Sequence, residues 1–312
     1  MFRNYLKKSE SSDASRLSKT CLLMLFATLV SSGCQQNPDL GPVANVATFE
    51  QTRTAFKSGS PDEGAGSAAA ATGTGWATIK GRIAFEGAPP VMAPYNANKD
   101  QATCTIDGKA PLQETLLVDE ASKGVANIVV FARKVSRVHE SAQPKTEPVL
   151  FDQKECVFLT HVFPMTIGQA ISIKNSDPVG HNTNIEGSNG FNQTIPANET
   201  VDFTPQKAEA IPKPIRCSIH PWMIAYYLPR KDGYVAVTAA DGSFEIPKVP
   251  AGEKIEFQVW HESGTGPGGA LVLDTPEAKE LKWTKKGRFA VTLAEDEVRE
   301  IQLTAPASAF GG

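Results

Sequence analysis

Short runs of alternating apolar and polar residues dominate the chain from residue 76 onward. In Trp76–Phe85 nearly every second side chain is apolar, and the run ends at Gly87-Ala88-Pro89-Pro90. This period of two predicts a strand with one buried face. The run Val125–Phe131 is apolar at almost every position, which is typical of a strand buried on both faces. No segment keeps a helical period, so the pattern predicts an all-β protein.

The remaining predicted strands fall into two groups separated near residue 230. The first group contains Glu155–Thr160, Thr166-Ile167, Ala170–Asn175, Phe191–Ile195, Val201–Thr204 and Ile215–Cys217. The second contains Tyr234–Thr238, Ser243–Ile246, Lys254–Trp260, Ala270–Leu273, Arg288–Thr292 and Val298–Thr304. Short strands separated by glycine and proline predict an antiparallel sandwich or barrel over 76–230 and a smaller β-sandwich over 231–306. Residues 307–312 are expected to form a loose tail.

The first 75 residues have a different composition. Five basic residues precede an apolar run from Cys21 to Val30, which is too short to cross a bilayer and therefore predicts a signal peptide over 1–33. The run ends at Ser31-Ser32-Gly33-Cys34, which resembles the lipobox of bacterial lipoproteins and implies that Cys34 is acylated. The alternative is an ordinary cleaved signal that leaves Cys34 free. Small residues in 34–75 predict a flexible linker.

The net charge of the chain limits the classes of partner that we expect it to bind. Without residues 1–33 the chain carries 26 basic and 32 acidic residues, a net charge of −6. This balance argues against nucleic-acid binding. No other apolar stretch approaches membrane length, so we expect attachment to a membrane through the N-terminal lipid alone. The expected location is the periplasmic side of a bacterial envelope.

The five cysteines divide by position. Cys21 leaves with the signal peptide, Cys34 is the lipidation candidate and Cys217 lies in a metal-ligand pattern. Cys104 and Cys156 remain, and an even pair in an exported protein predicts a disulfide. The alternative is a second metal site formed by Cys156 and His161.

One segment concentrates metal-binding chemistry. It reads Cys217-Ser218-Ile219-His220-Pro221-Trp222-Met223, and His181-Asn182 lies 36 residues before the cysteine. One thiolate, two imidazoles and a thioether are the ligands of a mononuclear blue-copper site, in which sulfur favours the reduced ion and imidazole tolerates both states. Structural zinc usually collects two or more cysteines, and a binuclear copper centre would need a second cysteine in this loop. The pattern therefore predicts one copper ion.

Residues 149–230 resemble the cupredoxins, and the C-x₂-H-x₂-M loop is similar to that of the amicyanins. The resemblance implies a Greek-key β-sandwich in which His181, Cys217 and His220 are equatorial copper ligands and Met223 is the axial one. It also implies that Asn182 joins the two ligand loops. We expect the His220 imidazole edge to lie near the surface, with Pro221 and Trp222 as an apolar rim for a redox partner. A core-capping role is the alternative for Trp222.

The second predicted sandwich resembles the transthyretin-like and carboxypeptidase-regulatory units, which are related to carbohydrate-binding folds. Val237-Thr238-Ala239-Ala240-Asp241-Gly242-Ser243-Phe244 carries this resemblance. Together the two units are similar to exported bacterial proteins of the methylamine-utilisation type. The favoured function is therefore a non-enzymatic carrier of single electrons between periplasmic redox proteins. The alternatives are a non-redox envelope protein that binds glycans or proteins, and copper storage or delivery.

Overall fold

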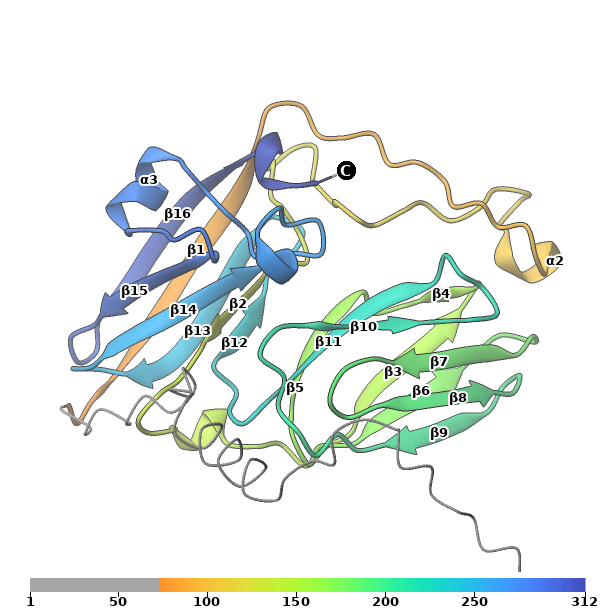
Figure 1. The fold of residues 1–312 in the computed structure, drawn as a ribbon, viewed down its shortest axis with the longest axis horizontal. Helices are drawn as coiled ribbons and strands as arrows, with labels where there is room; N and C mark the ends of the chain where they lie inside the picture. Colours follow the sequence, from red (N-terminus) through yellow and green to blue (C-terminus); the bar gives the residue numbers. More distant parts are fainter. Residues whose placement is uncertain (1–72, 312) are drawn as a thin grey trace, which may run out of the picture. The chain divides into compact units, whose positions relative to one another are not determined.

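The computed structural model describes residues 73–311, which form strands β1 to β16 and two short helices, α2 and α3 (Figure 1). The predicted signal peptide, lipidation at Cys34 and residues 34–72 of the predicted linker over 34–75 lie outside the described residues. The prediction of an all-β fold is confirmed. Among residues 73–311, no helix is long and apolar enough to cross a bilayer.

Two facing sheets form the first sandwich, which we call the terminal sandwich because it contains both ends of the described chain. One sheet has the order β13-β1-β16 and the other the order β12-β2-β14-β15. Its core includes Ile79 and Ile83 from one sheet and Val130 and Phe257 from the other. The strand bounds are β1 Trp76–Glu86, β2 Val129–Ala132, β12 Val235–Val237, β13 Ser243–Pro250, β14 Lys254–Trp260, β15 Arg288–Thr292 and β16 Val298–Pro306.

The second sandwich, here the central sandwich, is built from consecutive strands. Its sheets have the orders β4-β3-β6-β9 and β5-β11-β10-β7-β8 (Figure 1). Phe151 and Ile173 from the first sheet and Ile185 and Ile215 from the second share one apolar core. The strand bounds are β3 Val149–Lys154, β4 Val157–Phe158, β5 Val162–Thr166, β6 Ile171–Asn175, β7 His181–Ile185, β8 Phe191–Ile195, β9 Thr200–Phe203, β10 Lys213–Arg216 and β11 Ile224–Arg230.

The sheets combine strands from both sides of the predicted boundary at residue 230. β1 lies between β13 and β16, and β2 lies between β12 and β14. β1 and β2 therefore belong to the terminal sandwich, although both precede the central sandwich in sequence. Three pairs of described strands, β1 with β16, β5 with β11 and β3 with β6, run parallel, so the sheets are mixed and not antiparallel throughout. Alternation predicts which face of a strand is buried, but neither its neighbour nor its direction.

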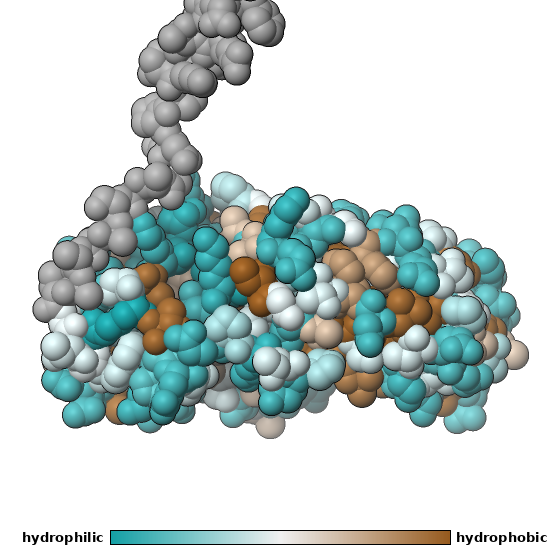
Figure 2. Space-filling view, turned by 90° about the horizontal axis from the view of Figure 1, so that it is seen from below, coloured by the Kyte–Doolittle hydropathy of each residue, from teal (hydrophilic) through white to brown (hydrophobic). Residues whose placement is uncertain are grey.

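The apolar run that contains β2 is buried on both faces, as its composition predicts. Val130 and Ala132 face the core of the terminal sandwich. Val129 and Phe131 instead pack in a smaller cluster with Val162 and Leu228 of the central sandwich and with Trp260. On the face shown in Figure 2, apolar side chains form separate small patches among polar ones. Most of the large apolar side chains thus lie inside the three clusters.

The Asp241-Gly242 turn joins β12 to β13. Gly242 has a φ of 80°, which favours glycine, and a Cβ there would lie 2.2 Å from the Ile83 carbonyl oxygen. The Asp241 carboxylate accepts a hydrogen bond from the Ser243 amide at 2.9 Å. This turn therefore requires glycine both for its backbone angle and for its contact with β1.

The C-terminal segment is packed, contrary to the expected loose tail. Ala309 and Phe310 are buried, and the Phe310 ring lies 5.2 Å from the His261 ring, edge to face. Burial of Phe310 against the terminal sandwich explains why the tail is ordered.

The predicted strand Ala270–Leu273 makes only a single bridge, between Ala270 and Trp260. Helix α3, Pro276–Glu280, follows this segment, and the Thr275 hydroxyl accepts a hydrogen bond from the Ala278 amide.

We expect His261 to make the folded protein less stable in acid. Burial lowers the pKa of His261 to about 3, and the nearby His161 acts in the same direction. An unfolded histidine titrates near pH 6.5, so below that pH the unfolded chain binds a proton that the folded chain does not. The free energy of unfolding should therefore fall by about 1.4 kcal/mol per pH unit between pH 6 and pH 4 from this group.

Urea unfolding of the wild type and of His261→Asn across this range measures the effect. The asparagine oxygen can still accept the bond that His261 Nδ1 accepts from the Ser263 amide at 3.2 Å, but it does not titrate. The variant should lose this contribution to the pH dependence. His139→Asn, at a half-buried ring, should retain it. Identical pH dependence in the wild type and His261→Asn would contradict the assignment.

Candidate metal centre

Two neighbouring strands bring the predicted ligands to one edge of a sheet. β7 begins at His181 and β10 ends at Arg216, immediately before Cys217. The two strands pair antiparallel, so the start of β7 lies beside the end of β10. Residues 217–223 then form the turn into β11. The Cys217 amide donates to the Met223 carbonyl at 3.3 Å, and the Met223 amide donates to the His220 carbonyl at 2.9 Å.

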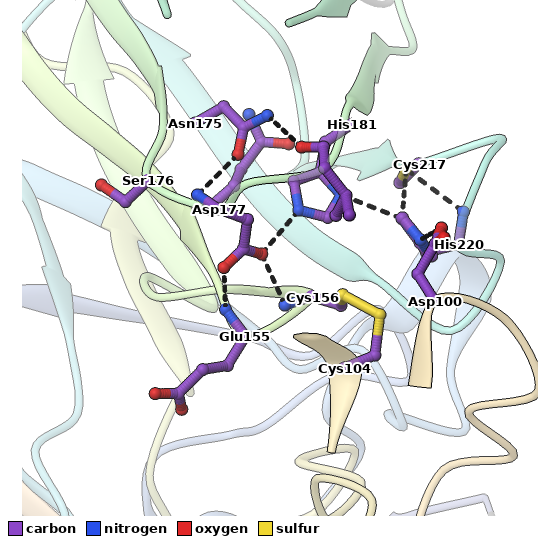
Figure 3. Close-up of polar contacts among 12 residues, drawn as sticks. Asp100, Cys104, Glu155, Cys156, Asn175, Ser176, Asp177, His181, Cys217 and His220 are labelled. Atoms are coloured by element: carbon purple, nitrogen blue, oxygen red, sulfur yellow. Dashed lines mark hydrogen bonds and ion pairs between the residues drawn. A yellow bond between two sulfur atoms is a disulfide. The ribbon is translucent and has the colours of Figure 1, made fainter. Parts of the chain in front are cut away.

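His181, Cys217 and His220 converge in the interior (Figure 3). The two Nδ1 atoms lie 2.9 Å apart, and Cys217 Sγ lies 3.8 Å from His220 Nδ1. One donor atom from each of the three side chains lies within 4.8 Å of the others. The exposed fractions are 0% for both histidines and 1% for the cysteine. This cluster is the candidate metal centre.

A carboxylate holds the far nitrogen of each imidazole. Asp177 Oδ2 lies 2.7 Å from His181 Nε2, and Asp100 Oδ2 lies 2.9 Å from His220 Nε2 (Figure 3). An ionised carboxylate only accepts hydrogen bonds, so each Nε2 carries a proton and each Nδ1 is the nitrogen left to bind a metal. Both Nδ1 atoms lie on the side of the rings that faces the thiol. Metal-ligating histidines are usually supported in this way from their other ring nitrogen.

The donor set fits a single copper ion. Two imidazole nitrogens 2.9 Å apart must share a proton or a metal ion, because two lone pairs at this distance would repel each other. Donors bound at about 2.0–2.3 Å to one metal ion lie roughly 3–4 Å from each other. The 2.9 Å between the two Nδ1 atoms and the 3.8 Å between Cys217 Sγ and His220 Nδ1 match this spacing. One thiolate with two imidazoles is the equatorial set of a blue-copper site. Structural zinc sites more commonly contain additional cysteines.

Asn182 ties the two ligand loops together. Its amide N–H donates to Cys217 Sγ at 3.2 Å, and its side-chain oxygen accepts from the Ser218 amide at 3.2 Å. The His220 amide also donates to Cys217 Sγ, at 3.3 Å. Burial alone would raise the pKa of the Cys217 thiol, but the hydrogen bonds to its sulfur outweigh burial and lower it. The surroundings thus favour the thiolate, the form that binds a metal.

Asp177 connects the centre to the neighbouring loop. Its buried carboxylate accepts the amide bonds of Glu155 at 2.7 Å and Cys156 at 2.9 Å in addition to His181. Burial raises the pKa of Asp177, but these hydrogen bonds outweigh burial and lower it. For His181, burial lowers the pKa, while the bond to Asp177 and the Cys217 sulfur raise it above the ordinary value. The pKa of His220 is lowered, mainly by burial.

The outer part of the predicted site differs from expectation. The His220 ring is completely buried, so its edge does not reach the surface. Trp222 is 8% exposed, and its indole N–H donates to the Cys156 carbonyl at 3.1 Å. Its core-capping alternative matches this placement, because a ring enclosed in the core has no free face for a partner. Pro221 is exposed.

Met223 is buried in the same loop. Its side chain lines a cavity of about 120 Å³ together with Trp222, Tyr95 and His161. The described centre therefore consists of three converged donors, with the predicted axial residue beside them in the loop.

Cys104 and Cys156 form a disulfide with a Cα–Cα distance of 4.9 Å. The sulfur of Cys156 is therefore not a thiolate, which removes the alternative of a second metal site with His161. The His161 Nε2 atom instead contacts the Glu262 carboxylate, and both side chains are buried. Glu262 thus pairs with His161 and not with its sequence neighbour His261.

Asp100 and Asp177 were missed as members of the site. Asp177 lies four residues before His181, and a carboxylate this close to a ligand histidine is a signal that could have been used. Asp100 lies 120 residues before His220 and has no local signal. Only the folded chain brings it to the centre.

No family model matches the chain, and no match is found among curated proteins. The solved structures that it resembles include amicyanin from Paracoccus versutus, with 15% identity over 32% of this chain and 97% of that chain and a TM-score of 0.25. They also include a copper-containing nitrite reductase from Thermus scotoductus SA-01, with 20% identity and a TM-score of 0.25. That match covers 27% of this chain and 22% of the reductase chain.

Proposed function

We propose that this protein is an exported mononuclear copper protein that carries single electrons between partners in a bacterial envelope and rearranges no bonds itself. The observation that supports this best is the buried convergence of His181, Cys217 and His220, with both imidazoles held by carboxylates. The predicted axial ligand, Met223, lies in the same loop as Cys217 and His220. Copper bound to such a set would supply one-electron redox chemistry.

The surroundings of the centre suit electron transfer more than substrate chemistry. The three donors are almost completely buried, and the hydrogen bonds of Asn182, Asp100 and Asp177 fix the two ligand loops. Fixed ligands change position little when the charge of the metal changes, which keeps the reorganisation energy small. Burial also keeps water and small reactants away from the metal.

The proposed location and partners follow from the sequence. Export, lipidation at Cys34 and the linker over 34–75 would hold the acidic body near a membrane surface. The partners would then be periplasmic redox proteins that exchange electrons with it. Globomycin treatment and labelling with a fatty-acid analogue in a bacterial host can test lipidation, since Cys34→Ser should remove the label.

Visible absorption of the full chain after addition of one equivalent of cupric ion tests the metal centre. We expect an intense thiolate-to-copper band that a mild reductant bleaches and an oxidant restores. As a control in a separate sample without copper, one equivalent of zinc should bind the same donors and produce no absorption band. A folded protein without the band would contradict the proposal and favour the non-redox binding protein. Tight binding of cuprous ion without reversible cycling would favour copper storage or delivery.

Replacement of Met223 by leucine should retain the band and raise the reduction potential. Compared with no axial donor, a thioether stabilises the more highly charged oxidised ion, and leucine removes this donor while filling a similar volume. Protein-film or mediated voltammetry measures the potential. Met165→Leu is the matched control, because Met165 is also buried in the central sandwich core but lies on β5. An unchanged potential in Met223→Leu would show that Met223 is not an axial ligand.

A further inference from the structure

The polypeptide between β1 and β2 covers the metal centre. Residues 94–112, which we call the cap hairpin, are closed by a bridge between Pro94 and Leu112 and by a 2.8 Å bond from the Tyr95 amide to the Pro111 carbonyl. They contain helix α2, Gln101–Cys104. Ala97 and Cys104 are buried in the core of the central sandwich. The cap hairpin therefore packs on the sandwich that carries the ligands.

A disulfide and a hydrogen bond hold the cap hairpin at the metal centre. Cys104, the last residue of α2, is joined to Cys156 by the disulfide. Cys156 lies beside the centre, because its amide donates to Asp177, which holds His181. Asp100, immediately before α2, reaches His220 Nε2 (Figure 3). The cap hairpin thus contacts His220 directly through Asp100. It is linked to His181 through the disulfide, the Cys156 amide and Asp177.

The exposed fractions of His220 and Asp100 show which of the two side chains faces water. The His220 ring is 0% exposed, whereas the Asp100 side chain is 37% exposed. The outward nitrogen of His220 is therefore covered by a carboxylate that itself reaches the solvent. In a centre without the cap hairpin, the same nitrogen would face water.

We propose that Asp100 is a positioning residue for the His220 imidazole and that the cap hairpin closes the outer side of the metal centre. Asp100 fixes the Nε2–H tautomer of His220, so that Nδ1 points inward to the other donors. Solvent and reagents reach Cys217 only when the cap hairpin moves away. The inference deepens the proposed copper function and rests on it for the role of the ligands, but cap closure can be measured without metal.

Accessibility of the Cys217 thiol in the metal-free full chain is the direct test. Iodoacetamide labels free thiols, and mass spectrometry of the peptide that contains Cys217 separates it from other cysteines. When opening is fast relative to labelling, the labelling rate follows the population of the open form. Loss of a hydrogen bond to a charged group should raise that population at least tenfold.

Asp100→Gly removes the carboxylate without straining the backbone. Asp100 has a φ of 46°, which glycine adopts freely. Asp107→Gly is a matched control, because Asp107 lies in the same hairpin, has a φ of 50° and is exposed. We expect Cys217 to be labelled at least tenfold faster in Asp100→Gly and at the wild-type rate, within about twofold, in Asp107→Gly. Equal rates in Asp100→Gly and the wild type would overturn the proposal, as would equal acceleration in both variants.

Two further readouts separate positioning from a general loosening of the fold. The ¹⁵N shifts of the His220 ring in the metal-free protein should report the Nε2–H tautomer in the wild type and a mixture of tautomers in Asp100→Gly. Asp100→Asn keeps the size of the side chain but can donate as well as accept, so it should give a mixture of tautomers with slower labelling than in Asp100→Gly. A mixture of tautomers in the wild type would overturn the positioning role. If copper produced no absorption band while these results held, the electron-carrier proposal would fail and the cap proposal would stand.

Discussion

Cys217→Ser should abolish the intense thiolate-to-copper absorption completely while leaving the fold intact. The band requires a sulfur ligand, and a serine hydroxyl at this position is neither a thiolate nor a soft donor. Serine is close to cysteine in size and can accept the amide bonds that Asn182 and His220 donate to the sulfur. The metal-free variant should therefore unfold at nearly the wild-type urea concentration. Absorption after addition of one equivalent of cupric ion measures the loss.

Ser218→Ala is the matched control for this experiment. Ser218 is the next residue in the loop and is exposed, and its contact with Asn182 uses the backbone amide, which alanine retains. This variant should keep the full band. A coloured Cys217→Ser protein, or a colourless Ser218→Ala protein that still folds, would show that the ligand assignment is wrong.

Removal of the Cys104–Cys156 disulfide should lower the free energy of unfolding by about 4 kcal/mol. The two cysteines are 52 residues apart, and closing a loop of that length removes considerable entropy from the unfolded chain. The double variant Cys104→Ala/Cys156→Ala avoids placing unpaired hydroxyl groups in the core, where both cysteines are fully buried. Urea unfolding of the metal-free protein measures the loss of stability.

Reduction of the wild type should reproduce most of this destabilisation, whereas Cys217→Ser should not, because Cys217 is free. A more expanded unfolded state should also increase the dependence of the unfolding free energy on urea concentration. A loss below about 1 kcal/mol in the double variant would contradict the expected contribution of the loop.

Several features could be predicted because they depend on residues close together in the chain. The strands Phe191–Ile195, Lys254–Trp260 and Arg288–Thr292 begin and end in the structure where their residue patterns indicate. Each has an apolar or β-branched pattern bounded by turn residues. By contrast, β7 was not predicted, since His181–Ile185 is mostly polar and is buried by its neighbours. A polar strand at a metal site lacks the alternation that marks other strands.

The ligand pattern was also local for Cys217, His220 and Met223, which share one seven-residue turn. His181 could be added because its loop resembles a cupredoxin ligand loop. Exposure of the ligands was not predictable in this way. His220 and Trp222, which were expected to reach the surface, are both buried. His220 Nε2 contacts Asp100, and the Trp222 indole donates to the Cys156 carbonyl.

Local patterns of burial period, turn chemistry and donor type were enough to predict the all-β class, most strand positions and the candidate copper ligands. Local patterns could not predict that β1 and β2 pair with the C-terminal strands or that Asp100 contacts His220. Such pairings join residues more than a hundred positions apart. Burial of apolar side chains over the whole chain determines these pairings, so the pattern of one segment alone cannot predict them.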